Sequence, residues 1–263
     1  MQIHLLASGS DGNATLVISG KTAILIDAGI GPIQLKRRLA LLDLDVSDLQ
    51  ALFITHEHYD HISGLAKKSF PKIPIFANRS TSSNAQFVLP KDIPHEWHEQ
   101  QVGEMITIGD LTLTSFATSH DSALSVGFQV TDKREKLLFA TDLGVTDTII
   151  ETEMRTADYI VLEANHDLTM LREGPYPLYL KRRVASQQGH LSNEQAADIL
   201  ATNINEHTRW IGLAHLSRTN NFPSLALRAL ERALNRVQDS LHPSLAIDVG
   251  VPLASGLPPV SSK

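Results

Sequence analysis

The segment Thr55–His61 reads THEHYDH and follows directly on an apolar run, so that three histidines and one aspartate fall within six positions. Imidazole nitrogens and carboxylate oxygens are the ligands that hold zinc, manganese or iron at neutral pH. Side chains two apart on an extended segment point the same way, so His56 and His58 can serve one metal. Asp60 and His61 follow where the chain turns and can serve a second one. The pattern predicts a two-metal site at the end of a buried strand.

Composition narrows the kind of site. The 263 residues, 42% of them hydrophobic, are enough to bury a core. The chain has no cysteine, so any metal must be held by nitrogen and oxygen. A net charge of −6 gives no broad basic surface for nucleic acid, although bound divalent cations would offset charge at the site. Because no apolar run approaches the ~18 residues of a membrane span, and the N-terminus lacks a signal-peptide pattern, we expect a cytoplasmic protein without a membrane partner.

Short runs rich in Ile, Leu and Val alternate with segments of helical periodicity, which is typical of an α/β fold. We expect two packed sheets with helices outside, in one domain over residues 1–253, followed by a flexible tail over residues 254–263. Strands are predicted at Gln2–Leu6, Thr15–Ser19, Ala23–Ile26, Ala51–Ile54, Met105–Ile108, Leu111–Ala117, Ser125–Val130, Lys136–Ala140, Ile160–Leu162 and Trp210–Leu213. Helices are predicted at Ile33–Leu42, Ile62–Ser69, Ser192–Asn203 and Pro223–Val237, the third opening with the capping-box pair Ser192 and Gln195.

Four further candidate ligands stand at the polar ends of apolar strands. They are Asp27, His120, Asp142 and His215. An Asp or His that ends a strand is most often a turn or cap residue. Four such endings beside the Thr55–His61 cluster favour a shared metal site over four separate turns.

In this order, the residues resemble the five-motif signature of the metallo-β-lactamase superfamily. The resemblance implies a four-layer αββα sandwich with a binuclear site along one edge. It implies two ligand sets joined by one bridging carboxylate: His56, His58 and His120 for one metal, Asp60, His61 and His215 for the other, and Asp142 between them. Asp27 would then orient a ligand histidine or its loop without binding metal.

Finer sequence features resemble the YycJ (WalJ, VicX) group within that superfamily, which is associated with exonuclease-type cleavage of DNA. The matching segments are Gly9–Asn13, Leu162–Asp167, Gly189–Asn193 and His215–Asn221. The chain is more distantly similar to ribonuclease Z, in which a glutamate and a later histidine assist proton transfer. That resemblance implies the same role for Glu163 and His190.

A two-metal site suits phosphodiester hydrolysis. The metals, zinc or manganese with iron as a further option, lower the pKa of a shared water from about 15.7 toward ~7 and so yield a bridging hydroxide. Asp60 could receive the proton of this nucleophile, and His190, held by Glu163, would protonate the leaving oxygen. Two plainer interpretations stay open at this point. His190 could merely pack near the start of a helix, and Glu163 could merely accept backbone hydrogen bonds.

Weaker candidates lie in neighbouring loops. His166 is assigned a supporting or substrate-side role, with a surface histidine as the alternative. Ser10 and Asn13 could shape a loop whose backbone N–H groups face phosphate, and a plain turn explains them equally well. Arg218 and Asn220 follow a candidate ligand and could reach the substrate, or could lie in a solvated loop.

Three basic groups occur in this acidic chain: Lys36–Arg38, Lys67–Lys68 and Lys181–Arg183. Such groups are usually solvated helix faces. The third lies close in sequence to Tyr176 and Tyr179, and this segment could follow a nucleic-acid strand by charge and stacking.

The sequence thus predicts a binuclear, metal-dependent phosphodiesterase or exonuclease whose partner is nucleic acid or another phosphodiester. One alternative is a thioester or lactone hydrolase of the glyoxalase II type. Another is a non-catalytic regulatory protein that keeps the fold. A homodimer is compatible with the sequence, which contains nothing that tests it.

Overall fold

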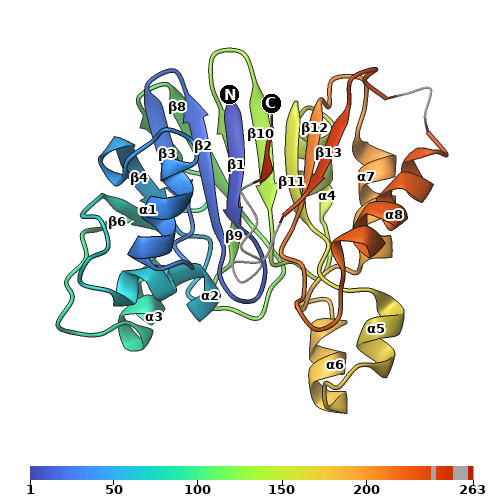
Figure 1. The fold of residues 1–263 in the computed structure, drawn as a ribbon, viewed down its shortest axis with the longest axis horizontal. Coiled ribbons are helices and arrows are strands. Elements are labelled where there is room, and N and C mark those ends of the chain that lie inside the picture. Colours follow the sequence, from blue (N-terminus) through green and yellow to red (C-terminus); the bar gives the residue numbers. More distant parts are fainter. Residues whose placement is uncertain (238–240, 251–259, 263) are drawn as a thin grey trace.

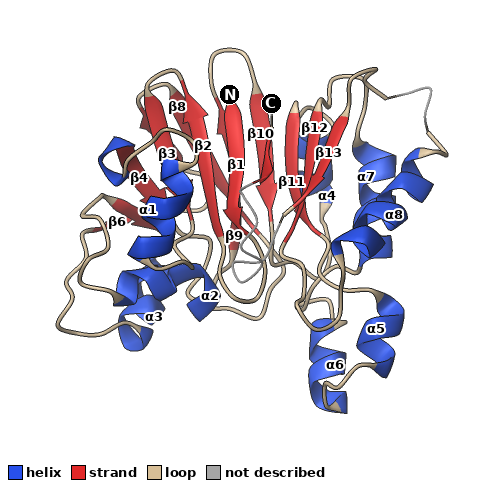
Figure 2. Ribbon diagram, viewed as in Figure 1, coloured by secondary structure: helices blue, strands red, loops and turns tan. Residues whose placement is uncertain are grey.

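The computed structural model describes residues 1–237, 241–250 and 260–262. Two sheets of seven strands each stack face to face, and helices cover their outer surfaces (Figures 1 and 2). The predicted four-layer αββα order is therefore confirmed. No helix in these described ranges is long and apolar enough to cross a membrane.

The first sheet has the strand order β14-β1-β2-β3-β4-β5-β6. From β3 to β6 its strands run parallel, so their C-terminal ends meet at one edge. The strands are β1 (Gln2–Ala7), β2 (Ala14–Ser19), β3 (Thr22–Ile26), β4 (Leu49–Phe53), β5 (Ile75–Ala77), β6 (Trp97–Glu99) and β14 (Val260–Ser261). The helical segments on this side are α1 (Pro32–Ala40), η1 (Val46–Asp48), α2 (Tyr59–Ile62), η2 (Ser63–Ala66) and α3 (Arg79–Val88).

The second sheet has the order β13-β12-β11-β10-β9-β8-β7, and β10 to β13 run parallel. Its strands are β7 (Met105–Ile108), β8 (Leu111–Ala117), β9 (Val126–Thr131), β10 (Lys136–Ala140), β11 (Tyr159–Glu163), β12 (Trp210–Ala214) and β13 (Ala246–Val249). The helices on this side are α4 (Thr148–Met154), α5 (Leu168–Glu173), α6 (Leu178–Val184), α7 (Asn193–Asn203) and α8 (Pro223–Leu234).

Three apolar layers hold the sandwich together. One lies between the sheets, where the Phe53 ring of β4 meets the Phe128 ring of β9 at 5.8 Å. A second packs α1 and α3 on the first sheet, and a third packs α4, α7 and α8 on the second. Alternating strand positions face opposite sides, so each sheet can contribute to two layers at once. Helix α7 begins with the predicted capping box, in which Ser192 and Gln195 exchange hydrogen bonds.

Most predicted elements occur, with their ends shifted by a few residues. The helix predicted at Ile62–Ser69 starts earlier, because α2 already begins inside the histidine-rich segment and passes into η2. The predicted flexible tail lies largely outside the described residues. In its described part, Val260–Ser261 pair with β1 as strand β14, so this part of the tail belongs to the first sheet.

Candidate metal centre

The polar strand ends converge on one edge of the sandwich. Nine residues meet there, brought in by the segments that follow β4, β8, β10 and β12, by the last residue of β11 and by the loop that precedes α7. Side-chain atoms lie within 4.8 Å of one another in four overlapping groups: His56, His58 and His120; Asp60, His61 and His215; His56, His61 and Asp142; and Asp142, Glu163, His190 and His215. Every predicted ligand belongs to at least one group.

Asp142 lies at the middle of this cluster. Its Oδ1 is 3.0 Å from His215 Nε2 and 3.7 Å from His120 Nε2, and its Oδ2 is 3.4 Å from His61 Nε2. Asp60 Oδ2 approaches the same side, at 3.4 Å from His215 Nε2 and 3.5 Å from His61 Nε2. One carboxylate thus touches residues of both predicted ligand sets, as a bridging ligand must.

Buried polar atoms in the cluster lack hydrogen-bond partners. Within the described part of the chain, His56 Nε2 and Asp142 Oδ2 are buried and make no hydrogen bond. Leaving such an atom unsatisfied costs about 1–3 kcal/mol. A divalent cation would satisfy this nitrogen and this oxygen together, and an all-nitrogen-and-oxygen set suits zinc, manganese or iron. The donor set therefore fits the predicted metals.

The ionisable side chains of the cluster shift one another's pKa values. Burial opposes ionisation of Asp142, yet the neighbouring His215 and His61 hold its pKa well below the usual value. Burial likewise opposes protonation of His61 and His215, but the surrounding carboxylates raise the pKa of both well above the usual value. Burial lowers the pKa of His56 well below its usual value, which favours the neutral, metal-binding imidazole.

Three site residues adopt a backbone conformation that costs energy. Asp27, Asp142 and His215 have φ angles of 62°, 58° and 54°. This left-handed region costs a non-glycine residue on the order of 1–3 kcal/mol, and such strain gathers at functional sites. Hydrogen bonds hold the strained turns: Asp142 N donates to Glu163 Oε2 at 3.1 Å, and His215 N donates to Ser8 Oγ at 2.6 Å. Each of the three residues stands within two positions of the end of a strand.

Asp27 contacts His61, one of the histidines that the superfamily resemblance implies as metal ligands. Its Oδ2 lies 2.8 Å from His61 Nδ1, which leaves His61 Nε2 directed toward Asp142. Its Oδ1 accepts from Thr55 N at 2.9 Å. Carboxylates that hold a ligand histidine fix its orientation and tautomer.

The variant Asp27→Asn is expected to weaken metal binding by about 10–100-fold with the fold intact. Asparagine tolerates a positive φ, so the turn survives, while the negative charge beside His61 is lost. Competition against a chromophoric zinc chelator measures the affinity. Asp43→Asn is the matched control, because Asp43 is exposed and has a φ of 58°. Equal zinc affinities in both variants would rule out this role for Asp27.

Asn13 anchors the loop that carries Asp60. Its Nδ2 donates to Asp60 Oδ2 at 3.2 Å, its backbone N donates to Asp60 O at 2.8 Å, and its Oδ1 accepts from Gly9 N at 2.9 Å. Gly29 lies against the same loop: a Cβ there would stand 1.7 Å from Asp60 O and 2.4 Å from Asn13 N. The backbone can approach this closely only because residue 29 is a glycine.

Gly29→Ala is therefore expected to destabilise the protein by about 3 kcal/mol, at the upper end of overpacking effects, because the new methyl group meets backbone atoms. It should also displace Asp60 and lower the metal content. Gly31→Ala is the control, since a Cβ there meets nothing within 4 Å. Urea unfolding of both variants, with metal analysis, gives the comparison. Similar unfolding midpoints for the two would contradict the close packing at Gly29.

Glu163 and His190 form a pair beside the cluster. Glu163 is fully buried at the end of β11, and its Oε2 lies 3.0 Å from His190 Nδ1. Its carboxylate also accepts from the backbone N of Asp142, Leu143 and Leu191. Glu163 thus accepts backbone hydrogen bonds and also contacts His190, so both of its oxygens are occupied. His190 Nδ1 is also 4.0 Å from Asp142 Oδ1, so the ring borders the proposed metals.

The comparisons with known proteins agree with this geometry. Residues 22–208 match the family model described as a beta-lactamase superfamily domain. The chain is 34% identical to the exodeoxyribonuclease YycJ of Bacillus anthracis over 237 residues, covering 89% of each chain. It is 35% identical to the exodeoxyribonuclease WalJ of Streptococcus pneumoniae over 228 residues, covering 84% of each. The chain belongs to the YycJ/WalJ family of the metallo-β-lactamase superfamily.

The fold of this family member also matches solved structures. The metallo-β-lactamase fold protein YhfI from Bacillus subtilis superposes with a TM-score of 0.70 at 17% identity, covering 99% of each chain. The superfamily resemblance inferred from the motifs is confirmed. With its cluster of histidines and aspartates, the chain is a metal-dependent hydrolase.

The weaker candidate residues of this YycJ/WalJ-family chain differ in their burial and in their contacts. Burial lowers the pKa of His166 to about 4, and neither ring nitrogen has a hydrogen-bond partner among the described residues. Arg218 is exposed and pairs with Asp11 at 2.8 Å, while Ser10 is exposed beside it. Asn220 is wholly buried, and its side-chain Nδ2 and Oδ1 have no hydrogen-bond partner among the described residues.

Two supporting residues were missed by the sequence analysis. Ser8 accepts the backbone N–H of His215, and Asn165 Nδ2 donates to His215 O at 2.9 Å. Asn165 lies in one of the segments that resemble the family, and Ser8 directly precedes another. The sequence does not indicate, however, which atoms a Ser or Asn in a loop will contact. Only the folded chain shows that they support the strained His215 turn.

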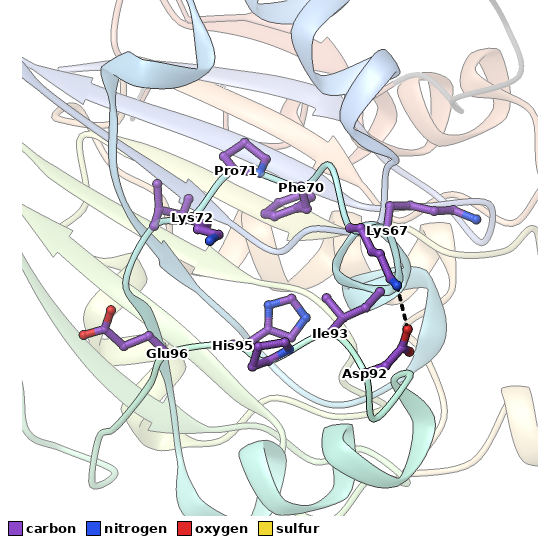
Figure 3. Close-up of a pocket in the computed structure, with 11 residues that line it drawn as sticks. Lys67, Phe70, Pro71, Lys72, Asp92, Ile93, His95 and Glu96 are labelled. Atoms are coloured by element: carbon purple, nitrogen blue, oxygen red, sulfur yellow. Dashed lines mark ion pairs between the residues drawn. The ribbon is translucent and has the colours of Figure 1, made fainter.

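A separate pocket of about 550 Å³ lies away from the metal centre, between the segments 67–73 and 92–96 (Figure 3). His95 borders it, and its Nε2 lies 2.9 Å from Leu65 O. Lys68 pairs with Asp92 at 2.8 Å across the rim, the dashed contact in Figure 3. His95 is thus engaged by the backbone, in keeping with its omission from the predicted site.

Proposed function

We propose that this chain is a two-metal phosphodiesterase that removes nucleotides from an end of nucleic acid. The observation that carries the proposal is the Glu163–His190 pair, which stands beside the cluster with His190 Nδ1 at 3.0 Å from Glu163 and 4.0 Å from Asp142. The relatives at 34–35% identity are named exodeoxyribonucleases, which supports the same reaction class.

The chain's own residues would hold two divalent ions. His56, His58 and His120 form one set, Asp60, His61 and His215 form the other, and Asp142 reaches both. Such ions supply Lewis acidity, which activates water at neutral pH and offsets charge on a phosphoryl group. The identity of the metals depends on supply in the cell, because this donor set accepts zinc, manganese and iron.

Two side chains, Asp60 and His190, can carry out the proton transfers. Burial opposes the ionised form of Asp60, but His61 and His215 lower its pKa below the usual value, so it is a carboxylate at neutral pH. It can accept a proton from the attacking water. Glu163 holds His190 through Nδ1, which leaves Nε2 to protonate the leaving oxygen of the sugar.

Two rival functions fit less well. A thioester hydrolase would use the same metal ligands, but a departing thiolate needs no proton, so the Glu163–His190 pair would have no role in that reaction. A lactone hydrolase releases an alkoxide and would use the pair, and the exodeoxyribonuclease relatives favour the phosphodiesterase over it. A regulatory protein would have no need of three strained turns at Asp27, Asp142 and His215. A catalytic phosphodiesterase uses both features.

Bis-p-nitrophenyl phosphate and a glutathione thioester, assayed side by side, distinguish the enzyme classes. Metal-loaded protein is expected to cleave the phosphodiester, and Asp60→Ala is expected to abolish this cleavage. Brisk thioester cleavage without phosphodiester cleavage would transfer the chain to the glyoxalase-like class. No turnover of either substrate, at full metal occupancy, would favour the regulatory protein.

A further inference from the structure

Two short helices project from the edge of the sandwich that carries the metal cluster. Figure 1 shows α5 and α6 extending beyond the strand ends, outside the four layers, and Figure 2 shows that short loops join them. We call residues 168–184 the helical arm. It lies in the chain directly after His166 and shortly before His190. Its position therefore brings it next to the site without making it part of the core.

Contacts tie the helical arm to the metal loops. Arg183 Nε donates to Asp121 Oδ2, next to the candidate ligand His120. Just after the arm, Gly189 O lies 3.2 Å from His120 Nδ1. Inside the arm, Lys181 Nζ donates to Arg172 O at 2.7 Å and joins the two helices. The arm is thus held in one position relative to the metal cluster.

One face of α6 carries an aromatic side chain next to basic side chains. Tyr179 is 74% exposed and Leu178 is 62% exposed. Tyr179, Arg182 and Arg183 are three and four residues apart, so they share one face of α6. Since Arg183 reaches Asp121, this face looks toward the metal loops. Arg182 is exposed and makes no ion pair within the described ranges.

We propose that the helical arm binds the nucleic-acid strand whose end lies in the metal centre, with Tyr179 stacking on a base and Arg182 contacting a phosphate. This inference rests on the proposed function. Aromatic rings beside cations are how proteins hold single strands without reading their sequence. In a chain of net charge −6, a polyanion is attracted only where cations gather.

The helical arm supplies that local positive charge, because residues 168–184 include four basic side chains and one acidic side chain, Glu173. Arg172 forms an ion pair with Glu173 at 3.0 Å, and Arg183 forms one with Asp121. Lys181 is engaged with Arg172 O, and Arg182 is left exposed near Tyr179. Another exposed basic pair, Lys36 and Arg37, lies on α1 over the first sheet.

The double variant Tyr179→Ala/Arg182→Ala tests the arm, with Lys36→Ala/Arg37→Ala as the matched control. Binding of a fluorescein-labelled, hydrolysis-resistant phosphorothioate single strand to metal-loaded protein is measured by anisotropy at several salt concentrations. The arm variant is expected to raise Kd about tenfold and to reduce the log–log salt slope by about 0.7, the share of one phosphate contact. Its hydrolysis of bis-p-nitrophenyl phosphate, which is too small to reach the arm, should stay within about twofold of wild type.

Failure of the arm and failure of the proposed function give different results. The proposed binding role of the helical arm would be overturned if the arm variant, the control variant and wild type had the same Kd and the same salt slope. This holds even if bis-p-nitrophenyl phosphate is cleaved normally. Absence of oligonucleotide binding by wild type would overturn it as well. Arm-dependent binding in a protein that cleaves no phosphodiester would support the arm and overturn the proposed hydrolysis.

Discussion

Asp142→Asn is expected to lower phosphodiester turnover by about 10³-fold or more, and to reduce the bound metal from two ions per chain toward one. Asp142 is the carboxylate whose oxygens approach His61, His120 and His215 within 3.0–3.7 Å. An amide keeps the size of the side chain and tolerates the φ of 58°, but it removes the negative charge around which the histidines gather. Elemental analysis of the purified variant and bis-p-nitrophenyl phosphate kinetics measure the two effects.

The exposed Asp43→Asn variant, with the same backbone φ, serves as the control and should behave as wild type. Circular dichroism and urea unfolding establish that the Asp142 variant is folded. A folded variant with two metals and turnover within about tenfold of wild type would exclude Asp142 as the ligand shared by both ions.

His190→Ala is expected to slow oligonucleotide cleavage by about 10²–10⁴-fold while both metals are retained. The effect should depend on the leaving group. A sugar alkoxide needs the proton that His190 supplies, whereas p-nitrophenolate is stable enough to depart without one. Bis-p-nitrophenyl phosphate should therefore be cleaved at nearly the wild-type rate. Glu163→Gln, which leaves His190 without its carboxylate partner, should show the same substrate dependence to a smaller degree.

A purely structural His190 would slow both substrates alike, or neither. The exposed His207 provides the control substitution, His207→Ala, for loss of an imidazole elsewhere. Equal losses on both substrates in His190→Ala, together with lost metal, would make His190 a metal ligand. An unchanged rate on oligonucleotide would remove it from the reaction.

The metal cluster could be predicted because each ligand follows an apolar strand. The end of a buried strand is a position the sequence reveals, and parallel strands carry such ends to one edge. Asp27, Asp142 and His215 were found this way, although their positive φ angles were not foreseen. Positive φ at an aspartate or histidine depends on contacts made far along the chain, such as the one between Ser8 and His215.

The parts that were missed lack a periodic signal. Strands β5 and β6 have three residues each, too few to show alternation. Helix α3 is rich in Ser, Thr and Asn, and it starts because the Asn78 side chain accepts from Thr81 N at 2.9 Å. The burial of Asn220 could not be foreseen either, because it depends on the start of α5, where Asp167 N donates to Asn220 O at 2.9 Å. Such outcomes follow from tertiary packing, which single positions do not reveal.

The most direct measurement follows end-labelled single-stranded DNA, duplex DNA and RNA during incubation with metal-stripped protein and with protein reloaded with zinc or manganese. We expect stepwise shortening from one end that requires metal and is lost in Asp60→Ala. The labelled products then give the polarity and the preferred nucleic acid. Intact substrates in every reaction, at full metal occupancy and with a folded protein, would contradict a nuclease built on this centre.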